Sequence, residues 1–291
     1  MRVKVVEQLP KLVSEKAAVL ESAGIDQAKG EIELILCHLL DVDRLHLYLD
    51  SPKRIDDNVI EKLDEIIARR ATRYPLQYIL EESWFYGRKF FVSPAVMVPT
   101  PETELLCETA LGYCKYRKYE RPRILDIGVG SGVISVTMAA ELNDCHMVAL
   151  DNSSEALDVA KKNAHDLGVA EKIDFRRSDF FSSVESDERF DLILSNPPYI
   201  TEADYKTLPP EVLADPKQAL TSGEDGLDAI REILRKAPDH LAEGGRIMFE
   251  IGYDQSGKIA GITEHDARFT SLNILRDLNG IDRIVILGCE R

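Results

Sequence analysis

The sequence lacks several features that would assign it to a common class of protein. Its five cysteines contain no Cys-x-x-Cys pair, and their odd number fits neither a disulfide framework nor a cysteine zinc site. Its six histidines form no ligand-like cluster, so no metal is predicted. No apolar run approaches the roughly 18 residues of a membrane span, and the N-terminal MRVKVVEQLPKLVSEK lacks the apolar core of a signal peptide. These absences predict a protein of the reducing cytoplasm that does not cross a membrane.

Positive charge is also scarce. The formal net charge at pH 7 is −15, whereas a protein that grips nucleic acid through its phosphates usually presents a basic patch or stripe. The balance of charge therefore argues against a broad nucleic-acid surface, and the acidity is typical of a soluble protein.

The first hundred residues change in character near residue 75. Residues 1–75 are predicted to form a small helical bundle, because apolar residues recur at helical spacing in segments such as VIEKLDEII. Residues 76–100 are richer in aromatic and β-branched residues, on either side of Gly87-Arg88, and predict a β-hairpin that links two domains.

Strands and helices alternate over residues 101–291. The helix predicted over SEALDVAKKNAHDLG has Ser153 as its N-cap and Gly168 at its C-terminal end. Such alternation predicts an α/β fold, Rossmann-like, with a mostly parallel sheet covered on both faces. The predicted strands are Arg123–Ile127, Met147–Asp151, Ile173–Arg177, Leu192–Ser195, Arg246–Ile251, Ser271–Leu275 and Arg283–Leu287.

A glycine-rich loop follows the first of these strands, in RILDIGVGSGVIS. Gly128, Gly130 and Gly132 give a G-x-G-x-G spacing, but Val133 stands where a dinucleotide fingerprint would have its third glycine. The lysine of a phosphate-binding P-loop is missing as well. The glycines still permit a tight turn and the close approach of a ligand, which in an open parallel sheet lies beyond the carboxyl ends of the strands.

Acidic residues at three strand ends indicate what this ligand is. Asp151 ends the second strand and can accept hydrogen bonds from a ribose diol. Asp179 and Phe180 follow the third strand and can bond and flank an adenine. Asp126, on the first strand, favours a cationic ligand over a phosphate. The pattern predicts a nucleoside without a pyrophosphate, such as S-adenosyl-L-methionine.

The fourth strand runs directly into an unusual ending, FDLILSNPPYI. Asn196 offers a side-chain oxygen acceptor, and Pro197 and Pro198 form a stiff segment without N–H groups. Together these acceptors can hold an NH2 group by both hydrogens, while Tyr199 supplies a flat face for stacking. This arrangement predicts methylation of an amide or an aromatic amine, because it would aim the nitrogen lone pair at the methyl donor.

With these motifs the sequence resembles the class I, seven-stranded methyltransferases with an NPPY motif, and closely the bacterial peptide chain release factor glutamine methyltransferases. The resemblance covers nearly the whole chain, through PLQYIL, WFYGRKFFVSPAVMVPTPETELL, LDIGVGSGVIS, SNPPYI, EVLADPKQALTSGEDGLDAIREIL and FEIGYDQ. It implies transfer of a methyl group from S-adenosyl-L-methionine to the glutamine side-chain nitrogen (N5) in the Gly-Gly-Gln motif of translation release factors, with S-adenosyl-L-homocysteine as product.

The resemblance also implies residue roles. The helical domain would help to dock the release factor. Apart from the resemblance, residues 201–226 are expected to form a loop over the substrate. Asn196, Pro197 and Tyr199 would be catalytic, and Asn196 to Tyr199, including Pro198, would hold the substrate glutamine. By resemblance, the methyl donor would be bound by Gly128, Val129, Gly130, Ser131, Gly132, Asp151, Phe180 and Asn196, and the strand-end pattern adds Asp126 and Asp179.

Two positions depart from the family pattern. Thr100 stands where the family usually has arginine and carries no charge for a contact there, and Glu81 follows PLQYIL where a glycine is expected.

Two other functions compete with this interpretation. An adenine-N6 DNA or RNA methyltransferase would use the same Asn-Pro-Pro-Tyr chemistry, but it would have to extract a base and hold a nucleic-acid backbone. A binding module that keeps the fold without catalysis is disfavoured by the intact NPPY motif.

Overall fold

The computed structural model describes residues 9–49 and 55–289, and the chain divides into two compact units. One, which we call the helical unit, comprises Met1–Glu81 with Pro209–Ala214. The other, the sheet unit, comprises Glu82–Leu208 with Asp215–Arg291. The helical unit therefore extends past residue 75 and includes a short segment from much later in the chain.

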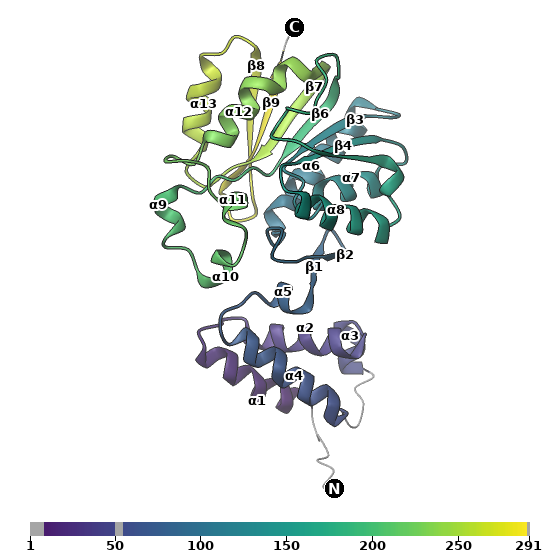
Figure 1. The fold of residues 1–291 in the computed structure, drawn as a ribbon, viewed down its shortest axis with the longest axis vertical. Helices are drawn as coiled ribbons and strands as arrows, with labels where there is room; N and C mark the ends of the chain where they lie inside the picture. The colour runs from purple at the N-terminus through teal and green to yellow at the C-terminus, as the bar shows by residue number, and fades with distance from the viewer. Residues whose placement is uncertain (1–8, 50–54, 290–291) are drawn as a thin grey trace. The chain divides into compact units, whose positions relative to one another are not determined.

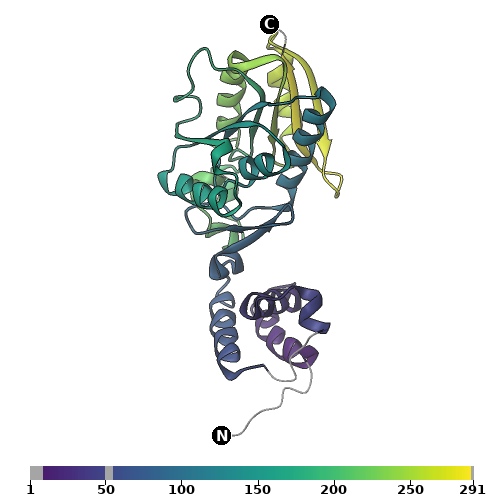
Figure 2. The same ribbon diagram turned by 90° about the vertical axis from the view of Figure 1, so that its right-hand side faces the viewer.

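The helical unit has a small apolar core of its own. Leu20, Ile32, Leu36 and Leu63 are fully buried there. Helices α1, α2 and α4 contact one another around this core (Figures 1 and 2). Its helices are α1 (Leu9–Ser22), α2 (Ala28–Leu40), α3 (Arg44–Leu49), α4 (Asp57–Arg70), α5 (Leu76–Leu80) and α10 (Pro210–Leu213).

A cluster of charges holds α10 within the helical unit. The buried guanidinium of Arg70 donates to Glu31 at 2.8 Å and to Glu211 at 2.9 Å, and Arg73 donates to the other oxygen of Glu211 at 2.8 Å. Burial alone would raise the pKa of Glu211, but the hydrogen bonds from Arg73 and Arg70 lower it to about 2. Glu211 is therefore ionised at neutral pH and fixes this segment to α4.

The β-hairpin is shorter than the predicted span of 76–100. Its antiparallel strands are β1 (Glu82–Phe85) and β2 (Arg88–Phe91). Tyr86 and Gly87, with φ of 49° and 72°, form the turn between them. Residues 76–80 form α5 instead of a strand, because Pro75 is well suited to precede a helix, and Glu81 ends it in a left-handed conformation.

The sheet unit is built on one large sheet, and all seven predicted strands are confirmed. Within the described residues the strand order is β5-β4-β3-β6-β7-β9-β8. β9 is reversed, since it pairs antiparallel with both β7 and β8, and the other described pairs of this sheet are parallel. Figure 2 shows β8 and β9, in yellow, at one edge of the sheet. The strands are β3 (Arg123–Ile127), β4 (His146–Asp151), β5 (Ile173–Arg177), β6 (Phe190–Ser195), β7 (Leu241–Glu250), β8 (Phe269–Arg276) and β9 (Asp282–Cys289).

Side chains of successive strand residues point to opposite faces of the sheet, and each face has a buried core. Ile124 packs on one face against α6 (Pro101–Arg117), α7 (Val133–Glu141) and α8 (Ser154–Asp166). Leu125 packs on the other face with α12 (Asp228–Lys236) and α13 (Ser256–Glu264). Figure 1 shows these two groups of helices on opposite sides of the sheet. The prediction of a sheet covered on both faces is confirmed, since side chains one residue apart point to opposite faces.

The predicted ends of α8 are also present. The Ser153 hydroxyl accepts a hydrogen bond from the backbone N–H of Ala156 at 3.1 Å, and Gly168 follows the helix with a φ of 71°. Across the part of the chain that the structure describes, no helix has the length and apolar character to span a bilayer.

The conformation of Glu81 predicts a stabilising substitution. Its φ of 56° lies in the left-handed region, where a side chain costs about 1 kcal/mol that glycine does not incur. We expect Glu81→Gly to raise the free energy of unfolding by about 0.5–1 kcal/mol, measured by urea denaturation. Glu81→Ala is the matched control, because it removes the carboxylate but keeps the Cβ. Equal stabilisation by both variants would show that charge, not backbone conformation, is responsible.

Candidate active site

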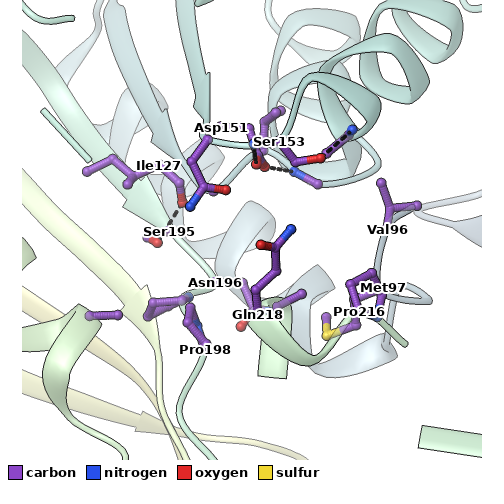
Figure 3. A pocket seen from close by; sticks show the side chains of 18 of the residues that line it. Val96, Met97, Ile127, Asp151, Ser153, Ser195, Asn196, Pro198, Pro216 and Gln218 are labelled. Atoms are coloured by element: carbon purple, nitrogen blue, oxygen red, sulfur yellow. Dashed lines mark hydrogen bonds between the residues drawn. The ribbon is translucent and has the colours of Figure 1, made fainter. Parts of the chain in front are cut away.

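The sheet unit contains a cavity of about 440 Å³ at the carboxyl ends of its central strands. This volume is within the range of small-molecule sites. Figure 3 shows Ile127 and Ser195 on one side of the cavity and Val96, Met97 and Pro216 on the other. The side chain of Gln218, from α11 (Lys217–Leu220), extends into the space between them.

The glycine loop lies at one wall of this cavity and is held by the neighbouring strand. The backbone N–H groups of Gly128 and Val129 both donate to the carbonyl of Leu150, at 2.9 Å each. Gly128, Val129, Gly130 and Ser131 line the cavity, as predicted for a loop that a ligand approaches closely.

Gly132 does not line the cavity but packs behind it. A Cβ on this residue would lie 3.1 Å from that of Ala160 in α8. The third glycine of the motif therefore lets a helix pack closely against the loop.

Asp151 lies at the end of β4 with its carboxylate already oriented. One oxygen accepts from the N–H of Gly130 at 3.0 Å and the other from the N–H of Ser153 at 2.9 Å. Burial raises the pKa of Asp151, and these N–H groups oppose the rise. Each carboxylate oxygen keeps a further lone pair, which a diol could use.

Asp126, which was predicted to contact the methyl donor, does not lie in the cavity. It is fully buried and is not among the residues that line the cavity. One of its oxygens accepts from the N–H and the hydroxyl of Ser135, at 3.1 and 2.6 Å, at the start of α7. The other oxygen has no hydrogen-bonding partner among the described residues. The Asp126 side chain thus fixes the start of α7, and this also fixes the end of the glycine loop on the side away from the cavity.

Asp179 and Phe180 line the cavity beyond β5, as predicted. Asp179 is exposed, and its N–H donates to the hydroxyl of Ser182 at 3.0 Å. Phe180 has a φ of 47°, which is strained for a bulky residue. Strain of this kind concentrates at functional sites, so the geometry supports a binding role for the ring.

The Asn-Pro-Pro-Tyr segment begins at a fixed point on the sheet. The buried hydroxyl of Ser195 donates to the carbonyl of Ile127 at 2.7 Å, which joins the end of β6 to the glycine loop (Figure 3). Asn196, Pro197 and Pro198 line the cavity. No hydrogen bond from the described residues reaches the backbone carbonyl of Pro197, so this acceptor is available.

Tyr199 is beside the cavity and does not line it. Its hydroxyl lies 3.5 Å from the carboxylate of Glu250, and its carbonyl accepts from Gln255 at 3.0 Å. Burial, and then the charge of Glu250, raise the pKa of Tyr199, so the phenol stays neutral.

Two residues linked to Asn196 by hydrogen bonds were not predicted from the sequence. The Asn196 amide donates to the hydroxyl of Thr103 at 2.9 Å, and that hydroxyl donates to Glu250 at 2.7 Å. Both occur in segments that carry the family resemblance. The sequence signal for Glu250 is an acid that follows a run of apolar residues at the end of a buried strand.

The charge of the residues that line the cavity indicates which kind of ligand it suits. Three of them, Asp151, Asp179 and Asp228, are acidic, and none is a lysine, arginine or histidine. A phosphate would find no cationic side chain here, whereas a ligand with an ammonium and a sulfonium would be favoured. S-adenosyl-L-methionine fits this set of donors and acceptors. Within residues 9–49 and 55–289, no group of His, Cys, Asp or Glu is arranged to hold a metal ion.

Residues 201–226 form short helices with connecting turns. Pro209–Ala214 belong to the helical unit, while α9 (Glu202–Tyr205) and α11 belong to the sheet unit. Pro216, Gln218, Thr221 and Gly223 line the cavity. This part of the segment therefore supplies a wall of the site.

Fold and site together define a class I methyltransferase. A family model described as the methyltransferase small domain matches residues 115–226, and one described as the PrmC N-terminal domain matches residues 11–80. The catalytic domain of hMettl16, solved in complex with a MAT2A 3′UTR hairpin, has the same fold. It aligns with a TM-score of 0.56 at 14% identity and covers 77% of this chain and 92% of its own.

Curated relatives specify the family. The release factor glutamine methyltransferase of Cereibacter sphaeroides is 42% identical over 273 residues, which cover 93% of this chain and 95% of that protein. The protein of the same name from Neisseria gonorrhoeae is 37% identical, over 89% of this chain and 92% of its own. This chain belongs to the release factor glutamine methyltransferases.

The buried carboxyl of Asp126 predicts a pH-dependent stability. Burial raises its pKa from 3.8 to about 7, against the hydrogen bonds from Ser135. A raised pKa favours the folded state at low pH, and this contribution is lost as the pH rises through about 7. Relative to Asp126→Asn, the wild-type free energy of unfolding should fall by roughly 2–3 kcal/mol between about pH 5 and about pH 8.

Urea denaturation of both proteins at the two pH values measures this difference. Asp179→Asn removes an exposed carboxyl near the same cavity and is the control. Its free energy of unfolding relative to wild type should change much less between the two pH values. A constant difference between wild type and Asp126→Asn at both pH values would contradict the assignment.

Proposed function

We propose that this protein transfers a methyl group from S-adenosyl-L-methionine to the side-chain amide nitrogen of the glutamine in the Gly-Gly-Gln motif of translation release factors. The observation that carries the proposal is the Asn-Pro-Pro-Tyr segment at a cavity whose charged residues are all acidic. Membership of the release factor glutamine methyltransferases supports it. This activity belongs to translation, so we place the protein in the cytoplasm.

The methyl donor would bind along the carboxyl ends of β3, β4 and β5. The backbone of Gly128–Ser131 would pass close to it, and the carboxylate of Asp151 would accept from the ribose hydroxyls. Asp179 and Phe180 would contact the adenine through a hydrogen bond and the face of the ring. Asp126 and Gly132 would act indirectly, because they hold the loop from behind and do not line the cavity.

When bound, S-adenosyl-L-methionine supplies an electrophilic methyl group on a sulfonium and leaves as S-adenosyl-L-homocysteine. Asn196 and Pro197 would supply the other half of the chemistry with two acceptors, the side-chain oxygen and the backbone carbonyl. An amide nitrogen is a poor nucleophile because its lone pair is delocalised. Acceptors on both of its hydrogens favour a pyramidal nitrogen and stabilise the positive charge that develops on it.

The protein's further contribution is alignment. Holding donor and acceptor in line can lower a barrier by roughly 7–11 kcal/mol. The stiff Pro197-Pro198 segment suits this task, since its backbone has little freedom to move. Tyr199 does not line the cavity, so it would support this segment from beside the site, where its hydroxyl faces Glu250. No strong base is required, because the nitrogen proton becomes acidic only once the bond to carbon forms, and it can then pass to water.

The release factor would be held by other parts of the chain. We propose that the helical unit docks it and that residues 201–226 bring the Gly-Gly-Gln loop to the cavity. No direct contact with nucleic acid is expected, given the net charge of −15.

The activity can be tested on its own substrate. Purified protein with radiolabelled S-adenosyl-L-methionine should label a release factor and leave unlabelled a variant of that factor whose Gly-Gly-Gln glutamine is alanine. Adenine-containing DNA and RNA in parallel reactions test the alternative chemistry. Equal label on both release factors would contradict the proposed glutamine, and label on nucleic acid alone would favour the adenine-N6 alternative.

A second prediction separates catalysis from binding of the methyl donor. Asn196→Ala removes one acceptor for the substrate amide and should lower kcat by at least roughly 100-fold, as loss of a transition-state hydrogen bond does. Calorimetric binding of S-adenosyl-L-homocysteine should stay within about fivefold of wild type, because most proposed donor contacts remain. Near-normal turnover would remove Asn196 from the mechanism.

A further inference from the structure

Asn196, which lines the cavity, is the first of three residues in the sheet unit that are joined by hydrogen bonds. Its amide donates to the Thr103 hydroxyl at 2.9 Å, and this hydroxyl donates to Glu250 at 2.7 Å. Thr103 is 2% exposed and Glu250 is 1% exposed. The three residues come from the segment after β6, the first turn of α6 and the last position of β7.

The direction of each bond follows from how many protons each group carries. An ionised carboxylate can only accept, so the single proton of the Thr103 hydroxyl must point at Glu250. The hydroxyl oxygen then offers only lone pairs to Asn196. The Asn196 amide must therefore turn its NH2 group toward Thr103 and its oxygen away. Among the described residues, no group donates to that oxygen, and Asn196 lines the cavity.

Protonation of Glu250 removes this constraint. A neutral carboxyl can donate its own proton to the Thr103 hydroxyl, which is then free to donate to the Asn196 oxygen. The amide could then rotate by half a turn and present its NH2 group to the cavity. A donor in that place would repel the NH2 group of a substrate glutamine.

We propose that Thr103 and Glu250 are positioning residues, which hold the Asn196 amide with its oxygen facing the substrate nitrogen. This inference rests on the proposed function, because it needs a substrate whose NH2 group must be accepted. Thr103 also lines the cavity, but its hydroxyl is engaged by Asn196 and Glu250, so both residues act on the substrate through Asn196.

The surroundings of Glu250 set the pH at which the arrangement holds. Burial raises the pKa of Glu250 to about 7, and the Thr103 hydroxyl and Arg283 of β9 oppose the rise. Glu102 of α6 raises it further, and Tyr199 faces the carboxyl with a weak hydrogen bond. The guanidinium of Arg283 also donates to the carboxylate of Asp277, at 3.3 Å. Wild-type kcat should therefore fall as the pH is lowered through about 7.

Thr103 variants test the hydroxyl. Thr103→Val keeps the shape of the side chain and removes the hydroxyl, and we expect roughly a 10- to 100-fold lower kcat, as when a group that orients a ligand is lost. The KM for S-adenosyl-L-methionine should change much less than kcat, because the proposed donor contacts of Gly128–Ser131, Asp151, Asp179 and Phe180 do not involve this hydroxyl. Thr103→Ser is the matched control and should restore kcat to within about threefold of wild type. A Thr103→Val kcat within twofold of wild type would overturn the proposal.

Glu250→Gln tests the charge. Glutamine has nearly the same shape but does not ionise near neutral pH, so the fall in kcat below about pH 7 should disappear. An acid limb that is the same in Glu250→Gln and wild type would overturn the role of Glu250. Melting temperatures of each variant, with and without S-adenosyl-L-homocysteine, identify any loss of kcat that is due to misfolding.

A measurement without substrate distinguishes this inference from the proposed function. The side-chain amide of Asn196, identified in 15N–1H spectra by its absence in Asn196→Ala, should titrate near pH 7 in wild type and not in Glu250→Gln or Thr103→Val. If it titrates in this way but no release factor is methylated, the proposed function fails and the positioning chain stands. If methylation occurs and the amide does not titrate, the positioning chain fails.

Discussion

The site depends on the parallel pairing of β3 with β4 on one side and β6 on the other. In this register Ile127 lies opposite Leu150 and Ser195, so the glycine loop, Asp151 and the Asn-Pro-Pro-Tyr segment all begin at one edge of the sheet. Three further hydrogen bonds tighten the arrangement: Gly128 and Val129 of the loop donate to the Leu150 carbonyl, and Ser195 donates to that of Ile127. A slip of one strand would separate the proposed donor half of the site from the acceptor half.

Charge gives this edge its chemical character. The cavity presents carboxylates and neutral acceptors, and the carboxyls of Asp126 and Glu250 are buried just behind it. Burial raises the pKa of both to about 7, so each is close to the point at which it gains a proton. Perturbed carboxyls of this kind are typical of functional sites. In this protein they act on different parts: Asp126 on the loop that would cradle a cation, and Glu250 on the orientation of a neutral amide.

Much of this organisation was predictable from the sequence, because it follows from local patterns. Apolar runs predicted all seven strands, and glycine spacing placed the loop. What escaped prediction depends on orientation or on distant contacts. Asp126 shares the strand face of Ile124, so it points at α7 instead of the cavity. Thr103 and Glu250 are 147 residues apart, and only the packing of α6 beside β7 brings them together. The span 76–80 had β-like composition, yet it forms a helix after Pro75.

The central claim is that Asn196 and Pro197 form an acceptor pair for a carboxamide NH2 group. A crystal structure with S-adenosyl-L-homocysteine and a Gly-Gly-Gln peptide tests it most directly. We expect the glutamine nitrogen to lie within hydrogen-bonding distance of both the Asn196 side-chain oxygen and the Pro197 carbonyl, with the Asn196 NH2 group on Thr103. A glutamine bound through its own carbonyl oxygen to the Asn196 NH2 group would contradict it.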